Sequence, residues 1–133
     1  MQNTFYKKVN LNPKGSITGD CVVRAIANAL GKDWYQVFDD LTKIARDRCG
    51  VIDEPETYSI YLKDYPTVKV KFVDKYGENR RLRPRYFKEK GLNGTYIVSV
   101  AGHLTCVRNG VVEDTWNCAN KCAYKIWEIK NKE

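Results

Sequence analysis

Histidine, methionine and long apolar runs are the scarcest features of this 133-residue chain. No apolar stretch approaches the length that crosses a bilayer, and residues 1–10 hold no apolar run of the kind that a secretory signal requires. The low proline content and the 43% share of hydrophobic residues argue against disorder. We therefore expect one globular, cytoplasmic domain over residues 1–133, with no membrane partner.

A disulfide framework is not expected either, because the five cysteines are odd in number and unevenly spaced and no secretory signal is visible. Cys118 and Cys122 lie four residues apart, but no second pair and no neighbouring histidine completes a structural zinc pattern. Ordinary free thiols are the expected state of these residues. We expect neither a metal nor a cofactor.

Acidic residues are in the minority, since 16 Asp and Glu oppose 23 Lys and Arg and leave a net charge of +7. Such an excess favours acidic partners, nucleic acid included. A solvated basic helix face is the simpler interpretation of the densest basic run, and a phosphate-binding surface with stacking aromatics is the alternative. The run contains Arg80, Arg81, Arg83, Arg85, Lys88 and Lys90, with Tyr86 and Phe87 between them.

Helical periodicity marks the first half of the chain, and strand-like alternation marks the second. After an irregular lead-in, the predicted helices cover residues 20–30, 33–48 and 56–62. Gly31 should end the first helix, and Asp33 should cap the second. The predicted later elements are a strand at 68–72, a short helix at 84–90, and strands at 95–101, 103–108, 111–116 and 123–129. Helices followed by a mostly antiparallel sheet indicate an α+β fold.

Asn109-Gly110, between two alternating runs, is a strong hairpin signal. A two-residue turn places Cys106 opposite Glu113 and puts His103 and Asp114 on one face as diagonal neighbours. Their backbones would lie roughly 7–8 Å apart, a gap that two side chains can close. The register turns Asn117 to the other face, so Asp114 is expected to orient the imidazole, unless a bulge shifts the register by one.

Cys21 lies in the first turn of the first helix, where unpaired N–H groups and the positive end of the dipole favour a thiolate. Its own N–H group can supply half of an oxyanion hole. The second donor should come from Asn12, Ser16 or Thr18, and we prefer the amide of Asn12. Asp20 is expected to cap the helix.

The sequence GDCVVRAIA at residues 19–27, the pair Gly102-His103 and the strand end EDTW at residues 113–116 together resemble papain-like cysteine peptidases. The layout is similar to small bacterial and phage members of that superfamily and to bacteriocin-processing peptidase domains. The resemblance implies helices packed on a sheet in the papain-like manner. It also implies Cys21 as nucleophile, His103 as base and Asp114 as orienting acid.

Two positions depart from related patterns. Residues 21–27 also resemble the nucleophile region of ovarian-tumour-type deubiquitinases, but Thr18 stands where that family has an aspartate. Gly15 stands where papain itself has a glutamine, six residues before the nucleophile.

Other residues have simpler roles. Cys49 lies late in the second helix, where the dipole disfavours a thiolate, and Cys106 lies on the strand face opposite His103. Arg24 is expected to pair with an acid elsewhere in the chain. Trp116 is expected to be a core aromatic, with a wall beside the imidazole as the alternative.

Two functions follow from the sequence. The first is a thiol hydrolase that cleaves a peptide or isopeptide bond of a protein or peptide substrate through an acyl-enzyme, with acyl transfer to an amine open to the same residues. The second is a papain-like binding module of phage type, without catalysis, that binds a host protein or nucleic acid. The basic cluster of Arg80, Arg81, Arg83 and Arg85 motivates that alternative.

Overall fold

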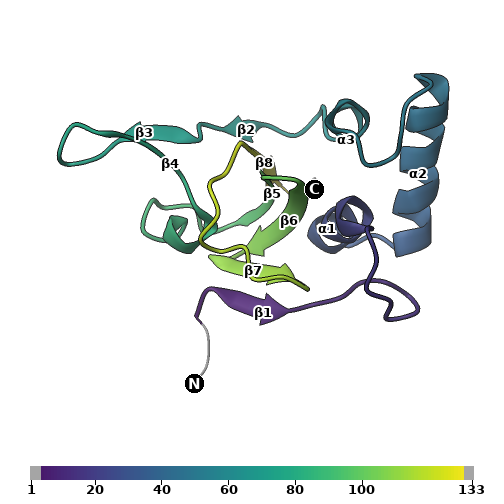
Figure 1. Ribbon diagram of the computed structural model, residues 1–133, viewed down its shortest axis with the longest axis horizontal. Helices are drawn as coiled ribbons and strands as arrows, with labels where there is room; N and C mark the ends of the chain where they lie inside the picture. Colours follow the sequence, from purple (N-terminus) through teal and green to yellow (C-terminus); the bar gives the residue numbers. More distant parts are fainter. Residues whose placement is uncertain (1–3, 131–133) are drawn as a thin grey trace.

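A computed structural model describes residues 4–130 and shows, within that range, three helices beside a six-stranded sheet (Figure 1). The helices are α1 (Cys21–Leu30), α2 (Trp34–Asp47) and α3 (Pro55–Tyr61), with one 3-10 turn, η1 (Pro84–Tyr86). The strands are β1 (Tyr6–Lys8), β2 (Thr67–Val68), β3 (Lys71–Val73), β4 (Asn79–Arg81), β5 (Thr95–Val100), β6 (His103–Arg108), β7 (Val111–Asp114) and β8 (Lys125–Ile129).

Both predicted helix signals are confirmed. Gly31 takes a left-handed conformation with φ of 66° just past α1, a backbone geometry that glycine adopts without a steric penalty. The Asp33 carboxylate accepts hydrogen bonds from the backbone N–H groups of Tyr35 and Gln36 at the start of α2.

Helix α1 packs against strands β5 and β6 of the sheet. Helix α2 packs against α1, and α3 packs against α2 (Figure 1). Residues 22–27 are buried all round, because α1 packs on β5 and β6 on one side and on α2 on the other. Such a helix is part of the core rather than a surface element. Its position relative to the strands is therefore tightly constrained.

The six-stranded sheet has the order β1-β7-β6-β5-β8-β2. All neighbours are antiparallel except β1 and β7, which run parallel. In the β6–β7 hairpin Cys106 pairs with Glu113 and Arg108 with Val111, so the predicted register is confirmed. Side chains alternate between two core clusters, as Ile126 and Trp127 of β8 do.

Three element predictions are wrong in detail. The lead-in contains the short edge strand β1, whose three residues carry too little alternation to reveal it. The single strand expected at 68–72 is split between β2 of the main sheet and β3 of a separate hairpin with β4. The helix expected at 84–90 is only the 3-10 turn η1 followed by turns, although Gly91 does take a positive φ of 79°. The part of the lead-in at residues 1–3 lies outside the described range.

The α+β class is confirmed, with helices first and a mostly antiparallel sheet second. Within residues 4–130, the helices are all too short or too polar to cross a bilayer.

Candidate active site

The turn between β5 and β6 places His103 at the start of its strand. Gly102 has φ of 64° in this turn, a conformation that strains an L side chain. His103 Nε2 lies 2.5 Å from Oδ2 of Asp114, its diagonal neighbour on β7. His103 and Asp114 thus come from the two strands of a single hairpin, the one whose register was predicted.

Asp114 is fully hydrogen-bonded. Its Oδ2 also accepts from the Thr105 hydroxyl at 2.6 Å, and its Oδ1 accepts from Arg24 at 3.0 Å and from the Thr115 backbone N–H at 2.6 Å. Burial raises the pKa of Asp114, but the hydrogen bonds from His103 and Thr105 outweigh burial, and the pKa is lowered. The carboxylate is therefore ionised at neutral pH although it is only 3% exposed.

Cys21 reaches the same histidine from the first turn of α1, and its thiol lies within reach of hydrogen bonds with the His103 side chain and the backbone of Leu104. Since Nε2 faces Asp114, Nδ1 is the ring nitrogen left for the sulfur. Burial raises the pKa of the Cys21 thiol, but these hydrogen bonds and the charges of His103 and Arg24 outweigh it, and the pKa is lowered.

The imidazole shows the complementary change. Burial lowers the pKa of His103, but the hydrogen bonds to Asp114 and Cys21 raise it to about 9. A lowered thiol pKa beside a raised imidazole pKa favours a thiolate and an imidazolium at neutral pH.

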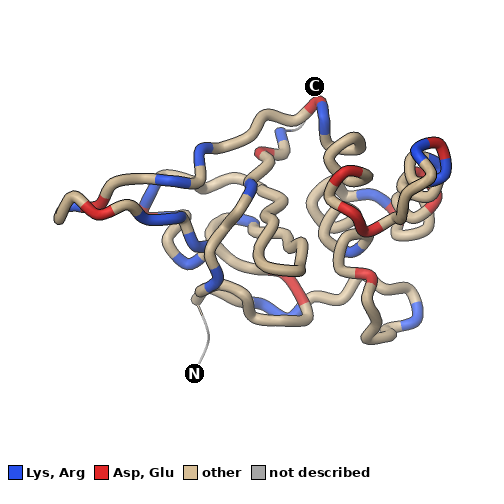
Figure 2. Tube along the Cα trace, turned by 45° about the horizontal axis from the view of Figure 1, so that its top comes forward, with Lys and Arg blue, Asp and Glu red and all other residues tan. Residues whose placement is uncertain are grey.

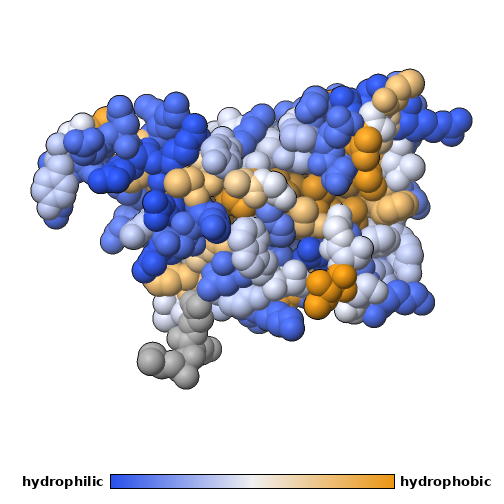
Figure 3. All heavy atoms as spheres, viewed as in Figure 1, coloured by the Kyte–Doolittle hydropathy of each residue, from blue (hydrophilic) through white to orange (hydrophobic). Residues whose placement is uncertain are grey.

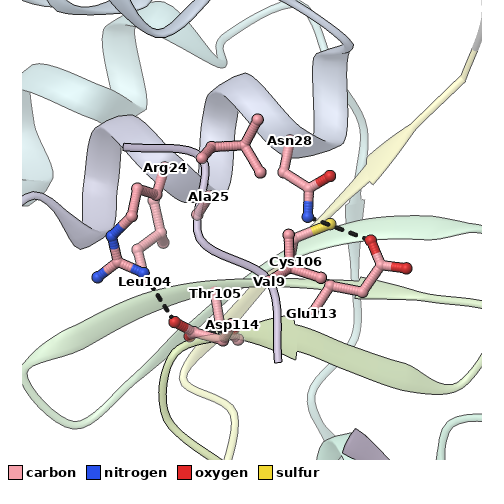
Figure 4. A pocket seen from close by; sticks show the side chains of 10 residues that line it. Val9, Arg24, Ala25, Asn28, Leu104, Thr105, Cys106, Glu113 and Asp114 are labelled. Carbon is pink, nitrogen blue, oxygen red and sulfur yellow. Dashed lines mark hydrogen bonds and ion pairs between the residues drawn. The ribbon is translucent and has the colours of Figure 1, made fainter. Parts of the chain in front are cut away.

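Arg24 was expected to pair with one acid, and in the structure it pairs with two. Its Nε donates to Asp20 at 2.7 Å. Its Nη1 donates to Asp114 at 3.0 Å, a contact that Figure 4 marks with a dashed line. One turn further along α1, Asn28 donates to Glu113 at 3.1 Å, so α1 is tied to β7 at two points. Between these ties lies a cavity of about 10 Å³, with room for about one water molecule.

Asp20 does not cap α1 with its side chain, contrary to the prediction. It occupies the N-cap position, but its carboxylate accepts from Arg24, from the Asn12 amide at 2.9 Å and from the Trp34 indole at 3.0 Å. A charge-assisted bond from the buried guanidinium is stronger than a bond from a neutral backbone N–H group. The first-turn N–H groups of α1 are consequently left uncapped by Asp20.

Asn12, the expected oxyanion donor, has other partners. Its Nδ2 donates to Asp20, and its Oδ1 accepts from the backbone N–H groups of Lys14 and Ser16. Neither Asn12 nor the alternatives Ser16 and Thr18 line the cleft at Cys21. Through these contacts Asn12 holds the Asp20 carboxylate in place. The role of Asn12 as an oxyanion donor stays a prediction.

A cleft of about 220 Å³ opens beside Cys21 and His103. The sequence did not reveal the residues on its far wall, since they come from the loop before α3, from α3 and from the end of β5. They are Asp53, Pro55, Tyr58, Ser99 and Val100. A second hollow of about 200 Å³ adjoins it at Val22 and Asp53. Apolar side chains dominate that hollow, namely Val23, Trp34, Phe38, Val51 and Ile52.

The remaining thiols differ sharply from Cys21. Cys118 lies near His103 and Asp114, a proximity that the sequence did not reveal, but it is fully buried and burial raises its pKa to about 11. Cys106 is fully buried in the core, and burial raises its pKa to about 12. Cys49 is exposed just past α2, which ends at Asp47, so its predicted place within the helix is wrong. Of Cys21, Cys106 and Cys118, only Cys21 has a lowered pKa, and it lines an open cleft.

His103, Asp114 and Cys118 each offer one metal-ligand atom, and these atoms lie within 4.8 Å of one another. They are the only such group among residues 4–130. A metal ion there would compete with the Arg24 and Thr105 hydrogen bonds to Asp114 and would need a buried thiolate from Cys118. The donor set therefore suits an acid–base arrangement better than a cation.

Trp116 is not a core residue, because it is 42% exposed. Its ring meets His103 edge-on, with centroids 5.0 Å apart and planes at 86°. The alternative interpretation, a wall beside the imidazole, is the arrangement found.

The basic run at residues 80–90 lies apart from this site and does not form a helix face. Arg80 and Arg81 belong to β4, Arg83 precedes η1, and Arg85 lies within η1. The hollow that Arg80, Arg81 and Arg83 line shares no residue with the cleft at Cys21.

Comparison of the chain with protein-family models, with curated proteins and with solved structures gives no match.

Proposed function

We propose that this protein is a thiol hydrolase of papain-like type, in which Cys21, His103 and Asp114 cleave an amide bond. One observation carries the proposal: the only histidine of the chain contacts both a thiol at a helix N-terminus and a buried carboxylate. A nucleophile, a base and an orienting group in hydrogen-bonding sequence are what thiol-based acyl transfer requires.

In the first half of the reaction, the Cys21 thiolate attacks the carbonyl carbon, and the C–S bond forms as the carbonyl electrons move to oxygen. The imidazolium then gives its Nδ1 proton to the leaving nitrogen, and the C–N bond breaks. In the second half, water attacks the thioester while His103 takes its proton. The C–S bond breaks and the thiolate returns.

Two further features support the chemistry. The uncapped N–H of Cys21 supplies one donor for the oxyanion, and the positive end of α1 stabilises the same charge. Asp114 keeps the imidazole oriented and charged, because burial without this partner would lower the pKa of His103.

A peptide is the substrate class that the surroundings of the thiol favour. The cleft at Cys21 and the apolar hollow lined by Trp34 and Phe38 adjoin at Val22, so an extended chain can pass the thiol and bury an apolar side chain. Burial of an apolar substrate side chain in this hollow would contribute binding energy close to the scissile bond.

The test uses p-nitrophenyl acetate as a minimal acyl donor and intact-protein and peptide mass spectrometry as the readout. Cys21 should acquire the acetyl group, and His103→Ala should slow acylation about 10²-fold or more. Exposed Cys49 serves as the internal control, because His103→Ala should leave its slow acylation unchanged. Equal acylation of Cys21 and Cys49, both unaffected by His103→Ala, would overturn the proposal.

A further inference from the structure

Nearly all of the net positive charge of this protein lies in one segment. Residues 69–90 contain nine Lys and Arg against three Asp and Glu, a net charge of +6 out of the +7 of the whole chain. The segment runs from β2 through the β3–β4 hairpin to η1, and the blue positions gather on this arm (Figure 2). The remainder of the chain is close to neutral.

This segment encloses a hollow of about 510 Å³, more than twice the size of the cleft at Cys21. We call it the basic hollow. It is lined by four cations, Arg80, Arg81, Arg83 and Lys90, by two acids, Asp74 and Glu89, and by Phe72, Asn79, Tyr86 and Cys122. Hydrophilic side chains cover the arm in the space-filling view (Figure 3). A concave surface with four cations focuses an electrostatic field better than a flat one.

Among the three acids of the segment, only Asp74 makes an ion pair within the described residues. Asp74 accepts from the backbone N–H groups of Tyr76 and Glu78 in the β3–β4 turn, and it pairs with Arg80. Arg83 donates only to the neutral amide of Asn120, and Arg81 donates to the backbone carbonyl of Ala123. These two guanidinium groups are therefore held in place without an opposing charge in their hydrogen bonds.

Aromatic rings accompany the cations. Arg81 lies over the ring of Tyr124 at 5.1 Å, Arg85 over Tyr86 at 5.4 Å, and Lys90 over Phe72 at 4.0 Å. Tyr86 is 40% exposed and Tyr124 is 53% exposed, so each has ring surface open to a ligand. An acidic peptide needs the cations alone, whereas unpaired bases use both the cations and the rings.

We propose that the basic hollow binds single-stranded nucleic acid, with the arginines on phosphates and Tyr86 and Tyr124 under bases. The proposal stands independently of the thiol chemistry, because the basic hollow and the cleft at Cys21 share no residue. A single strand is favoured over a duplex because the contact surface is concave and its rings reach only unstacked bases.

The first experiment measures binding of fluorescent oligothymidylate and oligouridylate of about 16 nucleotides by anisotropy against salt concentration. Three to four cations on phosphates predict a slope of about −2 to −3 for log affinity against log salt. Arg83→Glu with Lys90→Glu should weaken binding at least about tenfold. Lys43→Glu with Lys63→Glu makes the same change in net charge on the exposed helical side, and it should have a much smaller effect.

The second experiment separates base stacking from charge. Tyr86→Ala should weaken oligonucleotide binding about tenfold and leave binding of a polyglutamate peptide unchanged, since the peptide has no rings to stack. Tyr35→Ala on α2 removes a comparably exposed ring and serves as the control. Circular dichroism checks that each variant is folded.

A third measurement needs no variant. Cys122 lines the basic hollow, whereas Cys49 is exposed just past the end of α2, so bound oligonucleotide should protect Cys122 from maleimide and leave Cys49 reactive. No binding up to about 100 µM at about 50 mM salt would overturn the proposal, as would equal protection of both thiols. Equal or tighter binding of polyglutamate or of a duplex, or equal losses in the control variants, would overturn it too.

Discussion

Arg24 Nη1 donates to Oδ1 of Asp114 over 3.0 Å and so joins the helix that begins with Cys21 to the strand that orients His103. Both side chains are buried, with exposed fractions of 8% for Arg24 and 3% for Asp114. The same guanidinium holds Asp20. A single cation thus sets the distance between α1 and β7 on which the thiol–imidazole contact depends.

Removal of this cation should destabilise the fold. Arg24→Ala leaves Asp20 and Asp114 as buried carboxylates without their shared partner, and we expect a loss of about 3–5 kcal/mol in the free energy of unfolding. Urea denaturation measures it. Arg46→Ala, an exposed arginine in the last turn of α2, should change stability by about 0.5 kcal/mol or less. Similar losses in the two variants would contradict the structural role of Arg24.

Stability should fall steeply in acid. Burial raises the pKa values of Asp20 and Asp114, but hydrogen bonds from Asn12 and Arg24, and from His103 and Thr105, outweigh it, and both values are lowered below 3.8. A lowered native pKa contributes stability that is present above the unfolded value and lost as pH falls through the native value. Urea midpoints between about pH 2 and 6 should show this loss. Asp20→Asn should flatten the curve, and an unchanged slope would be inconsistent with the lowered pKa of Asp20.

On the alkaline side the two members of the pair should have opposite effects on stability. The raised pKa of His103 makes stability fall as pH rises from 6.5 through about 9, because the native protein then binds more protons than the unfolded chain. The lowered pKa of Cys21 makes stability rise with pH below 9.0, because the unfolded chain then holds a thiol proton that the native protein has released. In Cys21→Ala the unfolded chain has no thiol proton to offset the imidazolium. Its stability should therefore decline as pH rises from 6.5 through the native pKa of His103.

Trp116 should matter to the imidazole more than to the fold. Burial is the one influence that lowers the pKa of His103, so Trp116→Ala should raise that pKa while costing about 1 kcal/mol from the lost edge contact. Trp116→Phe keeps an aromatic edge near the ring and should change both less. The measurements are an NMR titration and urea denaturation. A lower pKa in Trp116→Ala would show that the ring does not screen His103 from water.

The hairpin turn should tolerate glycine and reject β-branched residues at Asn109. Its φ is 56°, a left-handed conformation that asparagine tolerates and valine resists. Asn109→Val should lose about 1–2 kcal/mol, and Asn109→Gly should lose only a few tenths. Both variants keep the backbone N–H that donates to Gly94, so urea denaturation isolates the conformational effect. Equal losses would contradict the turn geometry.

The parts of the site that local patterns determine were predictable from the sequence. Asn109-Gly110 defined the hairpin register, and that register brought His103 beside Asp114. Apolar periodicity and Gly31 defined α1, and hence the place of Cys21 at its tip.

Contacts between distant segments were not predictable in the same way. Whether Asp20 caps α1 or pairs with Arg24 depends on how deeply the helix is buried, which no local pattern gives. The pairing of β1 with β7 and the cleft wall formed by Tyr58 and Ser99 depend likewise on tertiary packing. Three-residue strands such as β1 carry too little periodicity to be seen.

The most direct test is the pKa of His103, because it is the only histidine and its ring protons give one unambiguous NMR titration. With Asp114 on one ring nitrogen and Cys21 on the other, the midpoint should lie near 9 in the wild type. It should fall in both Asp114→Asn and Cys21→Ala, whereas Cys49→Ala should leave it unchanged. A wild-type midpoint at or below 6.5 that neither variant changes would contradict the assembled thiolate–imidazolium pair.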